Sequence, residues 1–128
     1  MKKRRKSTEI SKVKKELWEL CKQLTRKAYG KTCYTCRKKR LKKSNCHTAH
    51  FIPSASCGTY LRYDLRNLRV CCYHCNINLG GAGALYYHNM RNEVGQDTID
   101  QLFKDVKRKV KNPLEFYKSL VVKYKSML

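Results

Sequence analysis

The chain has 128 residues and a mass of 15.1 kDa, and its 30 lysines and arginines against 9 acidic residues give a formal net charge of +21. This length fits one domain with a modest core, and no stretch approaches the roughly 20 apolar residues of a membrane span, which excludes an integral membrane protein. The basic N-terminus has no apolar run behind it and is not a secretory signal, so we expect a soluble, cytoplasmic protein whose charge meets a polyanion, most simply nucleic acid.

Residues 1–30 are predicted to form a basic arm and an amphipathic helix. Over residues 7–29 apolar side chains recur at three- and four-residue steps, with Ser7 or Thr8 placed as N-cap and Gly30 as the end. The apolar positions are Ile10, Val13, Leu17, Leu20, Cys21, Leu24 and Ala28. Residues 1–45 hold 18 of the 30 basic residues. This part is therefore either an electrostatic arm for a polyanion or a solvated surface without a dedicated partner.

Residues 31–95 are predicted to form the core. A cysteine knuckle with a basic turn at 31–45 is followed by a strand at 46–52, a loop, and a second extended segment within residues 60–70. These segments make a hairpin with a long loop. After a second knuckle a helix is expected, interrupted by Gly80, Gly81 and Gly83.

Residues 96–128 are predicted to form two helices that pack on the core, which gives one structural domain of the α+β class. The first begins near Asp97 or Thr98, and Pro113 is well placed to begin the second. Their apolar positions are Ile99, Leu102, Phe103, Val106 and Val110, then Leu114, Tyr117, Leu120, Val121 and Tyr124.

Two Cys-x-x-Cys pairs, 35 residues apart, indicate a metal site. Each pair can place two thiolates on one tetrahedral ion, so Cys33, Cys36, Cys72 and Cys75 predict a structural zinc site. The alternative, a redox motif of the thioredoxin type, has a single such pair at a strand-to-helix junction. The remaining cysteines are less informative: Cys21 is expected in the core, Cys71 is a substitute ligand, and Cys46 and Cys57 have no assignment.

Residues around the second pair carry groups suited to phosphodiester hydrolysis. His50 lies on the first predicted strand and Asn76 directly follows Cys75, so the two side chains could face one another. An imidazole can take a proton from water near neutral pH, and an amide oxygen can hold a divalent cation on a phosphate. Asn67 can bridge the two strands. The alternative for His50 is an ordinary hydrogen-bonding histidine.

These residues resemble the HNH, or ββα-metal, nuclease motif, with Asn directly after the second pair as in the phage endonuclease VII family of Holliday-junction resolvases. Over roughly residues 25–105 the chain is more closely similar to the lambdoid-phage NinG (Rap) recombination proteins. The matching segments are the first Cys-x-x-Cys, Cys46-His-x-x-His50-Phe, Leu61-Arg-Tyr-Asp-Leu-Arg-Asn67, Cys72-x-x-Cys75-Asn76-x-x-Leu-Gly and Gly95-x-x-x-Ile99-Asp-x-Leu102.

The resemblance implies a small ββα-metal core with a four-cysteine zinc knuckle, flanked by an N-terminal basic helix and C-terminal helices. It implies a metal-dependent DNA endonuclease with His50 as general base, Asn67 as positioning residue and Asn76 as ligand of Mg²⁺ or Mn²⁺. One departure matters, because many members have Asp immediately before the catalytic His, where this chain has Ala49. His47 and Asp64 are further candidate ligands.

The substrate implied is a branched recombination intermediate, a Holliday junction or D-loop, and a homodimer is expected so that two strands are cut symmetrically. DNA binding should depend on phosphate contacts. The candidate contacts are Lys38, Lys39, Arg40, Arg62, Arg66 and Arg69. Two alternatives stay open: a zinc-knuckle protein that binds nucleic acid without catalysis, which Ala49 favours, and a homing or restriction-type nuclease acting on linear duplex.

Overall fold

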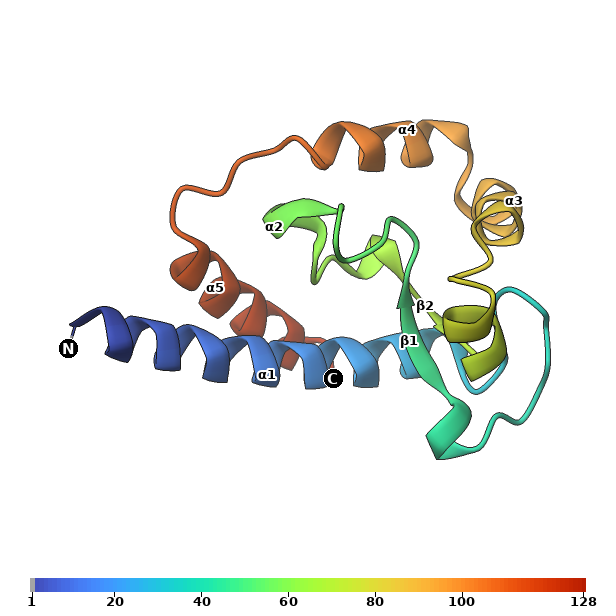
Figure 1. Ribbon diagram of the computed structural model, residues 1–128, viewed down its shortest axis with the longest axis horizontal. Coiled ribbons are helices and arrows are strands. Elements are labelled where there is room, and N and C mark those ends of the chain that lie inside the picture. Colours follow the sequence, from blue (N-terminus) through green and yellow to red (C-terminus); the bar gives the residue numbers. More distant parts are fainter. Residues whose placement is uncertain (1) are drawn as a thin grey trace.

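The structure is a computed structural model that describes residues 2–128, with side chains described from residue 8 onward (Figure 1). Helices enclose a small antiparallel hairpin. In chain order the elements are α1 Lys2–Tyr29, η1 Lys43–Asn45, β1 His47–His50, α2 Gly58–Leu61, η2 Leu65–Asn67, β2 Leu68–Cys71, η3 His74–Asn78, α3 Gly83–Val94, α4 Gln96–Asp105 and α5 Pro113–Ser126. No helix in this described part is both long and apolar enough to span a membrane.

The N-terminal helix α1 is longer than predicted. It begins at Lys2, so Ser7 and Thr8 lie inside the helix and the predicted N-cap is wrong. Its predicted end is confirmed, because Gly30 adopts a left-handed φ of +68° and its N–H donates to the Arg26 carbonyl at 2.7 Å. Figure 1 shows α1 running along one side of the molecule with α5 crossing it.

The hairpin pairs β1 with β2 in the register His47↔Cys71 through His50↔Leu68. The first strand lies within the predicted range, and the second extended segment, predicted within 60–70, begins only at Leu68, because α2 and η2 precede β2. Asp64 explains part of this difference: its carboxylate accepts the Arg66 N–H at 2.9 Å and caps the η2 turn. The antiparallel pairing itself agrees with the prediction.

The chain leaves β2 through the second cysteine pair into η3, a short π-helical turn. Left-handed φ values at Gly80, Gly81 and Ala82 then reorient it into α3, so the predicted interruption is confirmed at Gly80 and Gly81, whereas Gly83 is the first residue of α3. Helix α4 ends at Asp105, short of the predicted apolar positions Val106 and Val110. Helix α5 begins at Pro113 as predicted, and Asn112 caps it by accepting the Glu115 N–H at 3.3 Å.

Two apolar clusters hold these elements together. One combines the first knuckle and the hairpin with α3 and α4, and Tyr86, Met90, Ile99 and Leu102 are its largest α3 and α4 members. The other joins α1 to α5, with Leu17, Leu20, Cys21 and Leu24 against Tyr117, Val121 and Tyr124. The C-terminal helices therefore divide: α4 packs on the hairpin side and α5 on α1. The mixed class of helices with a small sheet is as expected.

Candidate functional site

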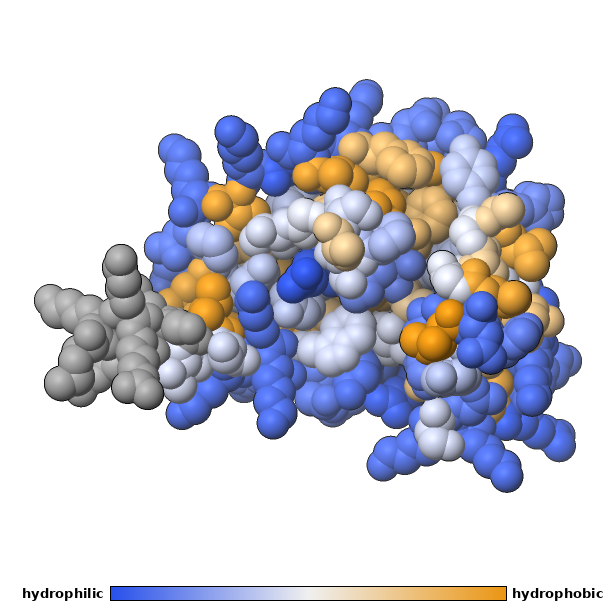
Figure 2. All heavy atoms as spheres, in the orientation of Figure 1, coloured by the Kyte–Doolittle hydropathy of each residue, from blue (hydrophilic) through white to orange (hydrophobic). Residues whose placement is uncertain are grey.

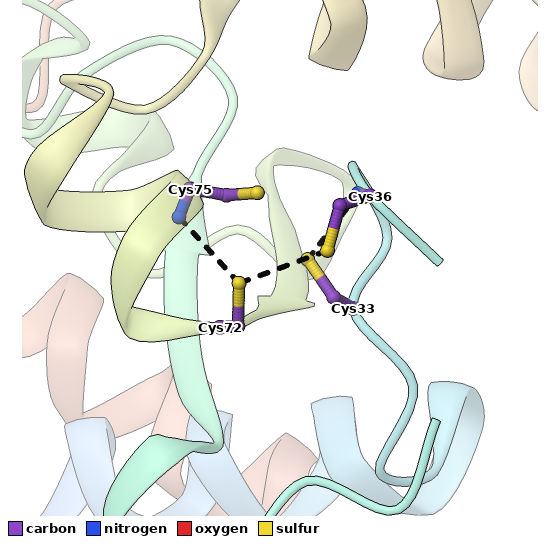
Figure 3. Close-up of side chains that lie close together, drawn as sticks. All are labelled: Cys33, Cys36, Cys72 and Cys75. Carbon is purple, nitrogen blue, oxygen red and sulfur yellow. Dashed lines mark hydrogen bonds between the residues drawn. The ribbon is translucent and has the colours of Figure 1, made fainter. Parts of the chain in front are cut away.

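Four cysteine side chains converge where the first knuckle meets the end of β2 (Figure 3). The sulfur atoms of Cys33, Cys36, Cys72 and Cys75 all lie within 4.8 Å of one another, and Cys36 Sγ is 3.8 Å from Cys72 Sγ. Four thiolates about 2.3 Å from a tetrahedral zinc ion stand roughly 3.8 Å apart. The donor set and its spacing therefore fit a structural zinc ion.

Backbone N–H groups in the two knuckles prepare these sulfurs for a metal. The Cys36 N–H donates to Cys33 Sγ and the Cys75 N–H to Cys72 Sγ, each at 3.5 Å. Burial raises the pKa of Cys33, but hydrogen bonds from the backbone of Cys36, Cys72 and Thr35 outweigh it and lower that pKa to about 7. Because the two pairs face each other, the arrangement favours metal binding over a redox motif.

The other four cysteines lie outside this cluster. Cys71 is buried with Sγ 3.6 Å from Thr35 Oγ1, and its sulfur is not one of the four that cluster. Cys21 is in the core as predicted, where its thiol donates to the Tyr63 carbonyl at 3.5 Å. Cys57 is buried and Cys46 half-buried.

Asn76, at the second knuckle, meets His47. The Asn76 amide nitrogen lies 3.2 Å from His47 Nδ1, and His47 Nε2 lies 3.3 Å from the Ser44 carbonyl oxygen. Since a carbonyl only accepts, Nε2 carries the ring proton and Nδ1 is the basic nitrogen. The His47 ring also stands edge-on to Tyr73 with the centroids 5.6 Å apart. The amide and the imidazole thus form a half-buried pair beside the cysteine cluster.

His50 has different partners. Its Nε2 donates to the Arg62 carbonyl at 2.9 Å, and its ring stacks on Trp18 of α1 with centroids 5.4 Å apart and planes 3° from parallel. Burial lowers the pKa of His50 and outweighs the opposing hydrogen bond to Arg62. Side chains three positions apart on a strand point to opposite faces. The expected meeting of His50 with Asn76 is therefore corrected: it is His47 that meets Asn76.

Asn67 bridges the hairpin to the chain that follows β1. Its side-chain oxygen accepts the Ile52 N–H at 2.7 Å, and its amide donates to the Ile52 carbonyl at 3.1 Å. Asn67 is fully buried, and its own carbonyl accepts the Phe51 N–H at 2.8 Å. The two residues after His50 are thereby held in place, while a catalytic role for Asn67 stays a prediction.

Arg69 does not lie at the surface. Only 2% of it is exposed, its guanidinium donates to Glu93 at 3.1 Å, and it lies over the rings of Tyr29 and Tyr34. It also donates to three backbone carbonyl groups of residues 65–68. A side chain held in this way is not free to clamp a phosphate, so the prediction that Arg69 contacts DNA is corrected.

The other predicted cationic contacts differ in availability. Arg66 bridges Asp64 at 2.8 Å and Asp105 at 2.9 Å, which neutralises it and also occupies Asp64 as a candidate metal ligand. Arg62 donates to the Ser54 carbonyl at 3.2 Å. Lys38, Lys39 and Arg40 are exposed on the first knuckle. Hydrophilic side chains project around much of the outline of the face shown in Figure 2.

Two residues near these groups were not singled out from the sequence. Trp18 occupies the apolar stripe of α1, where nothing in the local pattern separates a core residue from one that stacks on His50. Tyr86 is buried in α3 and its hydroxyl donates to the Ala49 carbonyl at 2.9 Å. Both contacts join segments distant in the chain, so no spacing rule could have found them.

Comparison with known proteins gives one family. The family model described as "Bacteriophage Lambda NinG protein" matches residues 1–128. No curated protein and no solved structure matches the chain significantly.

Proposed function

Because the chain belongs to the bacteriophage lambda NinG family, we propose that it is a metal-dependent endonuclease of the HNH type that cuts branched DNA recombination intermediates. The proposal joins the family to the chemistry of three side chains on and around the hairpin. A Holliday junction or D-loop is the proposed substrate, and a homodimer would allow symmetric cutting of two strands.

The observation that carries the proposal is the Asn76–His47 pair. The Asn76 amide and His47 Nδ1 lie 3.2 Å apart, and adjacent ligands of an octahedral ion with bonds of about 2.1 Å stand about 3 Å apart. The oxygen and nitrogen of an amide are exchanged by a half-turn, so the Asn76 oxygen can take the position facing His47. Bound Mg²⁺ or Mn²⁺ would neutralise charge on the scissile phosphate. His47 would replace the acidic ligand that is absent at Ala49.

His50 is the proposed general base. Its hydrogen bond to the Arg62 carbonyl leaves Nδ1 as the basic nitrogen, and its lowered pKa keeps the imidazole neutral at pH 7. Stacking on Trp18 holds the ring plane. A neutral, oriented imidazole is what proton removal from water requires.

The test is cleavage of labelled four-way junction, fork and linear duplex DNA of one sequence, with and without Mg²⁺. His50→Ala and Asn76→Ala should each lower the rate by about 10²- to 10⁴-fold, and His47→Ala should raise the Mg²⁺ concentration needed for half-maximal rate. The controls are His74→Ala and Asn78→Ala, whose side chains are exposed at the two ends of η3, the turn that also carries Asn76. Full activity of His50→Ala and Asn76→Ala would overturn the site, and equal cutting of linear duplex would overturn the substrate.

A second candidate function is DNA binding without cleavage. The observation favouring it is that His50 and Asn76 have separate partners, because Asn76 meets His47, which lies on the other face of β1 from His50. A binder would retain its affinity in the His50→Ala variant and give no product on any substrate with Mg²⁺ or Mn²⁺. The cleavage experiment therefore separates the two candidates.

A further inference from the structure

The first cysteine knuckle carries a hollow whose rim is cationic. The hollow measures about 560 Å³, and its lining comprises Lys31, Thr32, Lys39, Arg40, Leu41 and Lys42. Leu41 is only 3% exposed and forms part of the floor, while the four charged residues are exposed. No acidic residue lines it. Four positive charges around one hollow repel one another unless an anion lies between them.

These four cations differ from several others in the protein, which have acidic partners. Arg66, Arg69, Lys118 and Lys125 each have a carboxylate partner within 4 Å. No ion pair reaches the four cations of the hollow among the residues that the structure describes. No carboxylate of the described chain therefore offsets the charge of the hollow.

The backbone of the knuckle adds an independent observation. Arg40 has a left-handed φ of +55°, a conformation that costs free energy for any side chain except glycine. Arg37 in the same loop also has a left-handed φ, but its guanidinium lies 5.2 Å from the centre of the Tyr34 ring, so its side chain already has a partner within the protein. Arg40 has no such contact within the described chain. A strained arginine where glycine would be relaxed indicates a use for its guanidinium.

We propose that this hollow binds the phosphodiester backbone of the DNA, away from the scissile phosphate. The choice of DNA rests on the proposed function. Arginine and lysine side chains converging on an open hollow suit phosphate oxygens, which accept several charge-assisted hydrogen bonds. The hollow would thereby bind a DNA segment next to the segment that is cut.

The zinc site would set the position of this contact relative to Asn76. The hollow is built on the loop that carries Cys33 and Cys36, and backbone hydrogen bonds join its sides, with Leu41 N–H donating to Lys31 and Cys33 N–H to Lys38, each at 2.9 Å. Cys75, on the opposite side of the cluster, immediately precedes Asn76. A bound zinc ion would therefore fix the distance between the phosphate hollow and the Asn76–His47 pair.

The decisive variant is Arg40→Gly, because the two explanations of Arg40 predict opposite results. If the guanidinium serves DNA, its removal should weaken junction binding by about 3- to 10-fold, while relief of the left-handed strain leaves the melting temperature equal or higher. If Arg40 is structural, the melting temperature falls and affinity per folded molecule stays the same. The second result would overturn the proposal.

A larger substitution measures the phosphate contacts themselves. The variant carrying Lys31→Gln, Lys39→Gln, Arg40→Gln and Lys42→Gln should reduce the slope of log affinity against log salt by about 0.9 for each phosphate that is no longer neutralised. The matched control replaces Lys104, Lys107, Lys109 and Lys111 with Gln, because they are four exposed cations at the end of α4 and between α4 and α5. An equal fall in both variants would mean diffuse charge and would overturn the hollow as a site.

Binding is measured on a four-way junction by fluorescence anisotropy without added divalent cations, so no cleavage occurs. The hollow and the proposed function then fail separately. If the hollow variants lose affinity and the parent protein gives no Mg²⁺-dependent product, the proposal of a phosphate site in the hollow stands and the endonuclease proposal is refuted. If the hollow variants bind with normal affinity and the parent protein cleaves, the endonuclease proposal stands and the hollow is refuted as a DNA site.

Discussion

Replacing Asn67 with alanine should be among the most damaging single changes to the hairpin. The side chain accepts the Ile52 N–H at 2.7 Å and donates to the Ile52 carbonyl at 3.1 Å, and both residues are buried. Alanine leaves a buried donor and a buried acceptor without partners. At about 1–3 kcal/mol for each group, the free energy of unfolding should fall by roughly 3 kcal/mol.

Urea denaturation followed by circular dichroism measures this loss. With an m value of about 2 kcal/mol/M, a loss of about 3 kcal/mol moves the midpoint by roughly 1.5 M. The control is Asn78→Ala, whose amide is exposed 3.4 Å from His74 Nδ1 and should change stability by less than about 0.5 kcal/mol. Asn67→Asp adds a pH test, because its carboxyl can donate to the Ile52 carbonyl only when protonated, so this variant should become relatively more stable as the pH falls.

A midpoint for Asn67→Ala within about 0.3 M of the parent protein would refute this reasoning, since the implied cost would be below that of one unsatisfied buried group. Equal destabilisation by Asn78→Ala would also refute it. In that case the loss would not be specific to the bridge between Asn67 and Ile52.

Three further predictions concern the metal, the backbone and pH. Cys36→Ser should lose bound zinc and lower the melting temperature, whereas Cys46→Ser should retain one zinc per chain by elemental analysis; equal zinc in both would contradict the four-cysteine site. Gly58→Ala should cost about 1–3 kcal/mol, because φ is +78° and the new Cβ would lie 2.9 Å from a backbone carbonyl oxygen, whereas Gly83→Ala meets open space and should be neutral in thermal melts. Burial lowers the pKa of His50 in the folded chain, so near pH 6 the unfolded chain binds more protons than the folded chain, and stability decreases as the pH is lowered through the ordinary value of 6.5. The melting temperature of His50→Gln should therefore fall less than that of the parent protein between about pH 7.5 and about pH 5.5. An equal fall in both proteins would mean that other groups cause the pH dependence.

Several features followed from local pattern alone. The end of α1 at Gly30, the start of α5 at Pro113 and the break before α3 each depend on residues adjacent in the chain. The four clustered cysteines were also predictable, because each Cys-x-x-Cys pair builds a knuckle by itself and only the meeting of the two pairs is non-local. These features are short-range, so the spacing of residue types was enough to predict them.

The partners of individual polar side chains depended on the tertiary structure. Arg69 is predicted from the sequence as a surface cation, but the hairpin places it against α3, where Glu93 and two tyrosines enclose it. The sequence pairs His50 with Asn76 and offers His47 only as a further candidate ligand. The strand face turned toward α1 receives His50, and the face turned toward η3 receives His47. Composition and spacing specify which chemistry is present, but which groups meet depends on the packing of both faces of β1 by helices distant in sequence.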